Sequence, residues 1–115
     1  MDNLMTRDDV NEMDFYEMPK AFFEDPRYMS MRSESKIAYM LMYNLLALSE
    51  EKNQVNKNGE LYVKFSRDTL MRELNIKGNQ KAAQVMKELV DHELIVCKRV
   101  GLTQCNEIYL RDLKG

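Results

Sequence analysis

Hydrophobic residues recur at helical spacing in the middle of the chain, between residues 33 and 48. Ser33 can cap the start of this helix, and Glu34 suits its positive end. Because the apolar arc is wide, we expect this helix to be the most buried one. The expected inward stripe consists of Ile37, Leu41, Leu45 and Leu48, widened by Ala38, Met42 and Leu46.

The spacing changes on either side of this helix. Residues 60–65 alternate between apolar and polar, which predicts a half-buried strand after a turn at Asn58-Gly59. Earlier, residues 15–18 alternate enough for a short strand that Pro19 would end. Residues 21–24 can form a helical turn stopped by Pro26. Residues 1–13 are polar without a period and are expected to be a flexible N-terminal tail.

Helical spacing returns twice after residue 65. Ser66 can cap a second helix, which should end in a turn where Gly78 supplies freedom in φ. Asn79 can cap a third helix that runs to about Glu93. The expected inward residues are Leu70, Met71 and Leu74 in the second helix, and Ala82, Val85, Met86, Leu89 and Val90 in the third.

Two β-prone runs follow the third helix. Residues 94–99 and 106–110 flank a turn around Gly101 and predict a hairpin. Helix, turn, helix and hairpin follow one another in this order in winged helix-turn-helix proteins. The sequence therefore predicts a mainly helical α+β fold, with a small antiparallel sheet and a C-terminal wing hairpin, over residues 14–115.

The third helix carries the candidate functional face. If its apolar stripe points inward, amide and lysine side chains point outward. In a helix-turn-helix the second helix of the motif lies in the major groove, where Gln can pair with adenine and Lys with guanine or phosphate. Helix N-termini also favour phosphate. The candidate contacts are Asn79, Gln80, Lys81, Gln84 and Lys87 on this helix, Arg67 and Lys77 before it, and Lys98, Arg99, Thr103 and Gln104 in the wing.

Two simpler interpretations compete with this one. The polar side of the third helix could be only a solvated face, and the order of the neighbouring elements is what favours DNA. Lys98 and Arg99 could be edge-strand charges that prevent aggregation, instead of contacts to flanking phosphates. For the wing, the sequence leaves both interpretations open.

The charge distribution either indicates nucleic-acid contact on the C-terminal half or is a random fluctuation of a mixed surface. Residues 1–60 hold 12 acidic and 7 basic side chains, a net charge of −5, whereas residues 61–115 hold 7 acidic and 10 basic ones, a net charge of +3. Cys97, Cys105 and His92 lack metal-ligand spacing, and no catalytic set is recognisable, so neither an enzyme nor a cofactor is expected. With no signal peptide, we expect a cytoplasmic protein with reduced thiols.

Aromatic residues are concentrated in the first half of the chain. They include Tyr16, Phe22, Phe23, Tyr28, Tyr39 and Tyr43. Most should be core, and the surplus suggests either a homodimer interface or further core. A symmetric dimer would present two recognition helices to two half-sites.

A family resemblance is carried by five separated blocks, residues 16–23, 35–41, 58–63, 87–89 and 94–95. These blocks resemble the N-terminal domain of RepA-type plasmid replication initiators, and most closely those of staphylococcal multiresistance plasmids. The resemblance implies a winged-helix domain that binds iterons, the repeated double-stranded DNA sequences of a plasmid origin. It also implies a C-terminal domain beyond this chain that engages host replication proteins. DnaD-type primosomal domains share this kind of fold, so a protein-assembly module is the alternative.

Overall fold

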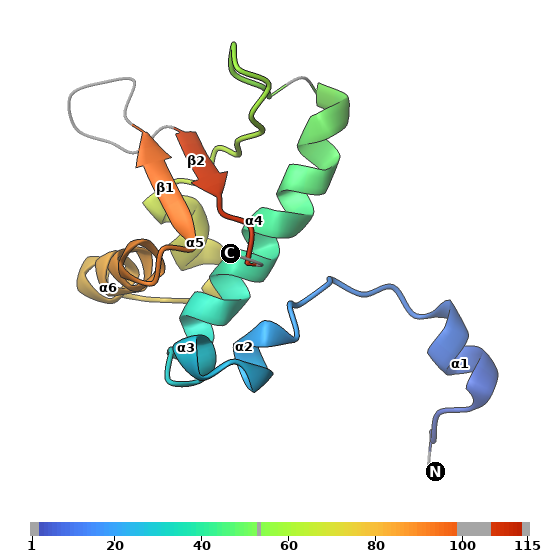
Figure 1. Ribbon diagram of the computed structural model, residues 1–115. Coiled ribbons are helices and arrows are strands. Elements are labelled where there is room, and N and C mark those ends of the chain that lie inside the picture. Colours follow the sequence, from blue (N-terminus) through green and yellow to red (C-terminus); the bar gives the residue numbers. More distant parts are fainter. Residues whose placement is uncertain (1–2, 53, 99–106, 114–115) are drawn as a thin grey trace.

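The computed structural model describes residues 3–52, 54–98 and 107–113, with the backbone alone described for 48–52. Helices dominate this part of the chain, and one antiparallel strand pair lies near its C-terminal end (Figure 1). The elements are α1 (Arg7–Glu12), α2 (Ala21–Glu24), α3 (Pro26–Met29), α4 (Ser33–Lys52), α5 (Arg67–Leu74), α6 (Asn79–Asp91), β1 (Ile95–Lys98) and β2 (Glu107–Leu110).

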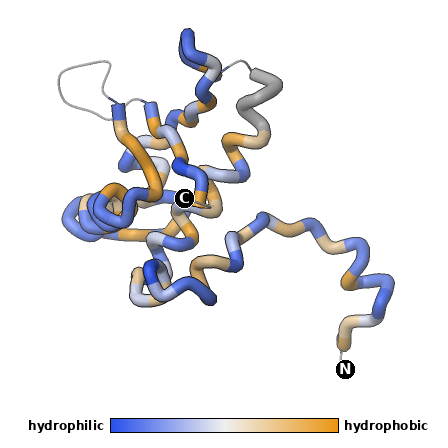
Figure 2. The backbone as a smooth tube through the Cα atoms, in the orientation of Figure 1, coloured by the Kyte–Doolittle hydropathy of each residue, from blue (hydrophilic) through white to orange (hydrophobic). Residues whose placement is uncertain are grey.

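The core lies where α4, α5, α6 and the strand pair meet. α4 contacts both α5 and α6, which also contact each other, and α6 contacts β1. Hydrophilic and hydrophobic residues alternate around the turns of α6, as expected when only one side of a helix is buried (Figure 2). The side chains in the centre are Phe22, Met42, Leu70, Leu89, Leu94 and Ile108, all fully buried.

The turn between α5 and α6 differs from the prediction in its details. Ser66 caps α5 as expected, because its Oγ accepts from the Thr69 amide at 3.0 Å. However, Asn75 and not Gly78 takes the left-handed conformation, with φ of 54°. Asn tolerates this region better than most residues, and it ends α5 directly. Gly78 has an extended φ of −136° and precedes α6, so Asn79 is the first helical residue and not the cap.

The sheet has β1 and β2 paired antiparallel, with Ile95 opposite Leu110 and Lys98 opposite Glu107. The predicted strand at residues 60–65 is reduced to isolated bridges. At one bridge, Val63 and Ile108 exchange two backbone hydrogen bonds of 2.9 Å. Val63 and Phe65 are buried while Lys64 between them is exposed, so the predicted alternation is confirmed here. β2 therefore pairs with β1 on one side and, on the other side, only with Val63 among the described residues.

Part of the predicted stripe of α4 is confirmed, because Ala38 and Met42 are fully buried and Leu41 and Leu46 pack against the core. Ile37 and Leu45, however, are each 39% exposed, and Ser35, Lys36 and Tyr39 are buried beside the predicted stripe, which shifts the buried side of the helix. Two sets of neighbours cause this shift. Phe22 of α2 packs edge-on against the Tyr39 ring at 5.2 Å, and α6 contacts α4 as well. Burial on α4 is therefore set by tertiary neighbours that the spacing of its apolar residues does not reveal. The side chain of Leu48 lies outside the description.

The N-terminal segment contains a helix where none was expected. Thr6 and Asp9 form a capping box that starts α1, and none of its residues is buried (Figure 1). The strand predicted at residues 15–18 does not form, because no partner strand lies beside it among the described residues. The helical turn at residues 21–24 is confirmed as α2, and Pro26 begins α3.

Two smaller predictions are also wrong. Val90 is 44% exposed, because it lies at the side of α6 that faces away from the core. Cys97 is disulfide-bonded and not a reduced thiol. It lies in β1, packs against the core, and belongs to a strand whose antiparallel pairing brings the two ends of the hairpin together. The second cysteine, Cys105, and Gly101 of the predicted turn lie outside the described residues. None of the described helices is long and apolar enough to cross a membrane.

Candidate nucleic-acid interface

The outward face of α6 presents polar side chains at helical spacing. Ala82, Val85 and Leu89 are fully buried on the opposite side, which fixes the rotation of the helix about its axis. Gln80 is exposed, and its amide makes no hydrogen bond to the rest of the described chain. Lys87 is also exposed and pairs with Asp91 one turn later at 2.7 Å. An exposed pair of this kind is weak, so a phosphate could compete for the Lys87 ammonium group.

The N-terminus of α6 is open. Gly78 occupies the cap position without a side-chain cap, and a Cβ atom there would meet no atom within 4 Å. The first backbone amides of the helix therefore have no side-chain acceptor, and such amides suit an anion. Lys77 and Asn79 flank this end, and both are exposed. These features together favour a phosphate at this position.

Lys81 faces α4 instead of the open side of α6. Its Nζ lies 2.6 Å from a carboxylate oxygen of Glu34, in the first turn of α4. The hydrogen bond from Lys81 holds the pKa of Glu34 below its ordinary value of 4.5. Lys81 therefore links two helices, and its charge is already partly balanced. The sequence placed it on the contact face, whereas the structure places it at the edge of that face.

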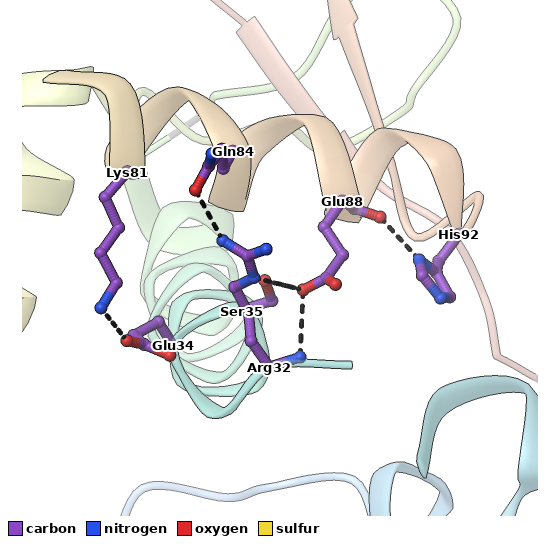
Figure 3. Close-up of polar contacts among 7 residues, drawn as sticks. All are labelled: Arg32, Glu34, Ser35, Lys81, Gln84, Glu88 and His92. Carbon is purple, nitrogen blue, oxygen red and sulfur yellow. Dashed lines mark hydrogen bonds and ion pairs between the residues drawn. The ribbon is translucent and has the colours of Figure 1, made fainter. Parts of the chain in front are cut away.

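Gln84 also has a partner inside the protein (Figure 3). Its Oε1 accepts a hydrogen bond of 3.0 Å from Nη1 of Arg32, the residue directly before α4. The Nε atom of Arg32 lies 3.6 Å from Glu88 Oε1. Glu88 Oε1 also accepts from the Arg32 backbone amide at 3.1 Å and from the Ser35 hydroxyl. Arg32 therefore lies beside the predicted contact face, although it is 52 residues away from Gln84 in sequence.

Arg32 is not among the predicted contact residues, because it belongs to no periodic pattern. It was also expected that Ser33 would cap α4, whereas Ser33 is the first helical residue and Arg32 occupies the preceding position. One sign was available, since Glu88 is an acidic residue on a helix whose predicted contact residues are amides and lysines. Such a carboxylate close to phosphates would be unfavourable unless a cation of the protein neutralises it.

The bracing helix α5 contributes one further predicted cation. Arg67 is the first residue of α5, is exposed, and makes no ion pair with another described residue. Arg72, in the last turn of the same helix, is exposed too. The structure therefore leaves both guanidinium groups available to a phosphate.

The wing is described as far as Lys98 on one side and from Glu107 on the other. The Lys98 ammonium group lies 4.7 Å from the centre of the Tyr109 ring, a cation–π distance. The Tyr109 hydroxyl donates to Glu107 at 2.7 Å, and this hydrogen bond raises the pKa of Tyr109. Lys98 is therefore held on one face of the hairpin. Arg99, Thr103 and Gln104 lie outside the described residues.

Other chemistry is not indicated by the described side chains. They contain no group of three or more His, Cys, Asp or Glu residues that could hold a metal ion. His92, at the end of α6, is engaged locally, since its Nδ1 lies 2.9 Å from the Glu88 carbonyl oxygen. The interface therefore consists of hydrogen-bonding amides, cations and a helix N-terminus.

One curated relative covers most of the chain. A protein of Lactobacillus helveticus described as "41 kDa protein" is 26% identical over 98 residues, which is 85% of this chain and 28% of that protein. The chain thus spans less than a third of the length of this relative.

Solved structures resemble the fold closely. A structure described as "N-Terminal domain of DNA binding protein" has a TM-score of 0.75 and 31% identity, over 97% of this chain and 85% of the other. "Structure of MDR initiator" has a TM-score of 0.73 and 31% identity, over 96% and 86%. "Structure of Rep-DNA complex" has a TM-score of 0.74 and 32% identity, over 96% and 84%. These likenesses confirm the predicted mainly helical winged-helix fold.

A family profile also matches most of the chain. The profile described as "Replication initiator protein A (RepA) N-terminus" matches residues 14–115. The match begins directly after the segment that contains α1, and it includes every element from α2 to β2. The chain therefore belongs to the family of replication initiator protein A (RepA) N-terminal domains, as its sequence blocks predicted.

Proposed function

We propose that this chain is the DNA-binding domain of a plasmid replication initiator and recognises double-stranded iterons at the replication origin. Family membership and the solved Rep-DNA complex with a similar fold support DNA as the ligand. That the bound DNA consists of iterons is inferred from the resemblance of the sequence blocks to RepA-type initiators. Initiation would follow when bound copies position the replication machinery at the origin.

The observation that carries the proposal is the outward face of α6. Its exposed amide and ammonium groups lie opposite a fully buried apolar stripe, and its N-terminus is open. A helix of this kind can enter the major groove with its first turns close to base edges. In this proposal Gln80, Gln84 and Lys87 face bases, and Arg67, Lys77, Asn79 and Lys98 face phosphates, with Lys81 at the edge.

The wing would contact DNA beside the groove. Lys98 is the described wing residue in this role, and Arg99, Thr103 and Gln104 complete the proposal from the sequence. Contacts of a wing with flanking phosphates add affinity without adding much base specificity. We propose the same division here, with α6 selecting the sequence and the wing strengthening attachment.

We also propose that the domain acts as a homodimer. Several aromatic and Met side chains before α4 are exposed, among them Phe15 at 69%, Phe23 at 60% and Met29 at 54%. Such residues in one segment favour burial against a second copy. Two α6 helices related by a two-fold axis would then require two half-sites separated by about one helical turn of DNA or a multiple of it. Host replication proteins would be engaged by a further domain of the longer initiator.

The proposal can be tested by fluorescence anisotropy with a labelled duplex that carries the origin repeats and a scrambled duplex of the same composition. Each duplex is titrated across a salt series. We expect tighter binding to the repeats at moderate salt, with a salt dependence that corresponds to several phosphate contacts. Equal and weak binding to both duplexes would contradict it.

The exposed apolar residues of the N-terminal segment also favour a second candidate function, a protein-assembly module. In that case the segment before α4 would bind a replication protein, and α6 would contribute little. Substitution of Phe15 and Phe23 by Ser distinguishes the two functions. These variants should keep their affinity for DNA per domain if α6 is the contact surface, and they should lose partner binding if the domain serves assembly.

A further inference from the structure

Arg32 connects the two helices that meet beside the contact face. Its guanidinium lies between Gln84 and Glu88 on α6, although Arg32 itself precedes α4 (Figure 3). The planar guanidinium group offers donors in fixed directions, so it can contact two acceptors at once. Nη1 donates to the Gln84 amide oxygen, and Nε lies close to the Glu88 carboxylate.

Glu88 is a fixed anchor for this guanidinium. Its Oε1 accepts from the backbone amide of Arg32 at 3.1 Å and from the hydroxyl of Ser35, which is fully buried. Neither contact involves the Arg32 side chain. The carboxylate thereby takes the role that a side chain at the third helical position has in a capping box, but it comes from another helix. Replacement of the Arg32 side chain should therefore leave Glu88 attached to the start of α4.

The contact determines which atoms Gln84 offers to a ligand. A glutamine amide has an oxygen that accepts and an NH₂ group that donates twice. Because Arg32 engages the oxygen, the NH₂ group is directed away from Arg32. In the major groove, a donor of this kind suits N7 and O6 of guanine, N7 of adenine or O4 of thymine. A glutamine without such a partner could turn its amide over and accept from cytosine or adenine amino groups equally well.

We infer that Arg32 is a positioning residue for sequence recognition: it fixes the Gln84 amide as a donor and so narrows the base that Gln84 accepts. This inference rests on the proposed DNA-reading function of α6. It assigns to a residue before the central helix, outside the helix-turn-helix, a part in the choice of sequence. The Arg32 guanidinium also adds positive charge beside the outward face of α6. The effect that is specific to this inference is the change in base preference.

The test uses Arg32→Lys, Gln84→Ala and the double variant. Each protein selects duplexes from a library randomised over about two helical turns, and sequencing gives the base preference at every position. Lys keeps the charge but cannot hold both acceptors with a planar fork. We expect Arg32→Lys to lower the preference at one base position by about tenfold, and to change binding to non-preferred duplexes by less than about twofold. Gln84→Ala should lower the preference at the same position.

The double variant measures whether the two residues act together. If Arg32 works through Gln84, then Arg32→Lys should change nothing further in the Gln84→Ala background. Arg27→Lys is the matched control, because Arg27 belongs to α3 and also contacts a carboxylate, that of Asp25 at 2.8 Å. Thermal unfolding of every variant checks that the fold is kept.

The outcomes separate this inference from the proposed function. A wild-type protein that selects no sequence would overturn the proposed function. A wild-type protein that selects a sequence, together with an Arg32→Lys variant of unchanged preference, would overturn the inference alone. Additive effects, or effects at different base positions, would show that Arg32 contacts DNA independently of Gln84 and would overturn it as well.

Discussion

α4 and α6 pack against each other, but they differ in which kinds of residue they bury. α6 buries one clean stripe and exposes polar side chains on the other side. α4 buries Ser35 and most of Lys36 while leaving Ile37 and Leu45 partly exposed. The difference follows from their neighbours, since α6 has its core on one side and α4 has packed elements on more than one. The buried residues of a helix that packs on one side can be predicted from its sequence. Those of a helix with neighbours on several sides depend on tertiary packing as well.

The largest expected effect contrasts a buried leucine of α6 with a partly exposed one of α4. Leu89→Ala removes a fully buried side chain and should lower the free energy of unfolding by about 2–5 kcal/mol. Leu45→Ala should lower it by less than about 1 kcal/mol, because Leu45 is 39% exposed. Urea unfolding followed by circular dichroism measures both. Equal losses would mean that the two helices are buried to the same degree and that the comparison fails.

The next effect concerns the open side of α6. Gln80→Ala removes an exposed amide without disturbing the core, and it should weaken binding to the preferred duplex by about 1–3 kcal/mol while relaxing one base position. Anisotropy with duplexes altered at single positions measures this. The control is Asn11→Ala, which removes an exposed amide from α1. If both variants bind alike, then the outward face of α6 does not select bases.

A smaller effect is expected from the wing. Lys98→Ala removes a cation that lies over the Tyr109 ring, and it should weaken all duplexes by a similar factor. The slope of log affinity against log salt should decrease in magnitude by about 1. Lys57→Ala, an exposed lysine before the Gly59 turn, is the control. Loss of base preference in Lys98→Ala, with an unchanged slope, would assign sequence selection to the wing as well.

The smallest effect is the pH dependence of the ion pair that joins the two helices. The pKa of Glu34 is lowered in the folded protein by the hydrogen bond from Lys81, so the pair stabilises the fold at pH values above 4.5. This contribution is lost as the pH falls through the lower, folded-state pKa. The difference in Tm between wild type and Lys81→Ala should therefore shrink in acid. Lys77→Ala, which loses no ion pair within the described chain, should show no such trend.

The same contrast between α4 and α6 explains how much of the fold and of the candidate site could be predicted from the sequence. The order α5, α6, β1 and β2 and the inward residues Ala82, Val85 and Leu89 were predictable, because each depends on local periodicity. The left-handed residue of the turn was assigned to Gly78, since glycine is the usual choice, whereas Asn75 takes that conformation. The position of Arg32 was not predictable from local periodicity. Its contacts join residues more than 50 positions apart, and only the tertiary packing of α4 against α6 brings them together.

The prediction for the N-terminal segment failed for the opposite reason. A local capping box at Thr6 is sufficient to begin α1, although this helix has no buried residue. The sequence pattern there lacks an apolar period, so a helix was not expected. Flexibility of residues 1–13 stays a prediction, as do the homodimer and the domain boundary at residue 14. The DNA contacts assigned to Arg99, Thr103 and Gln104 are predictions from the sequence alone.

The side of α6 that faces α4 has a mechanical consequence. Lys81, Gln84 and Glu88 follow one another along the boundary between that side and the outward face, and each contacts Arg32 or the first turn of α4. A shift of α6 by one residue requires a rotation of about 100° and would break all three ties together. These contacts therefore fix the rotation of α6 about its own axis. If α6 enters the major groove as proposed, it would meet every duplex in one register, and a mismatched sequence would have to deform because the helix cannot rotate to fit it.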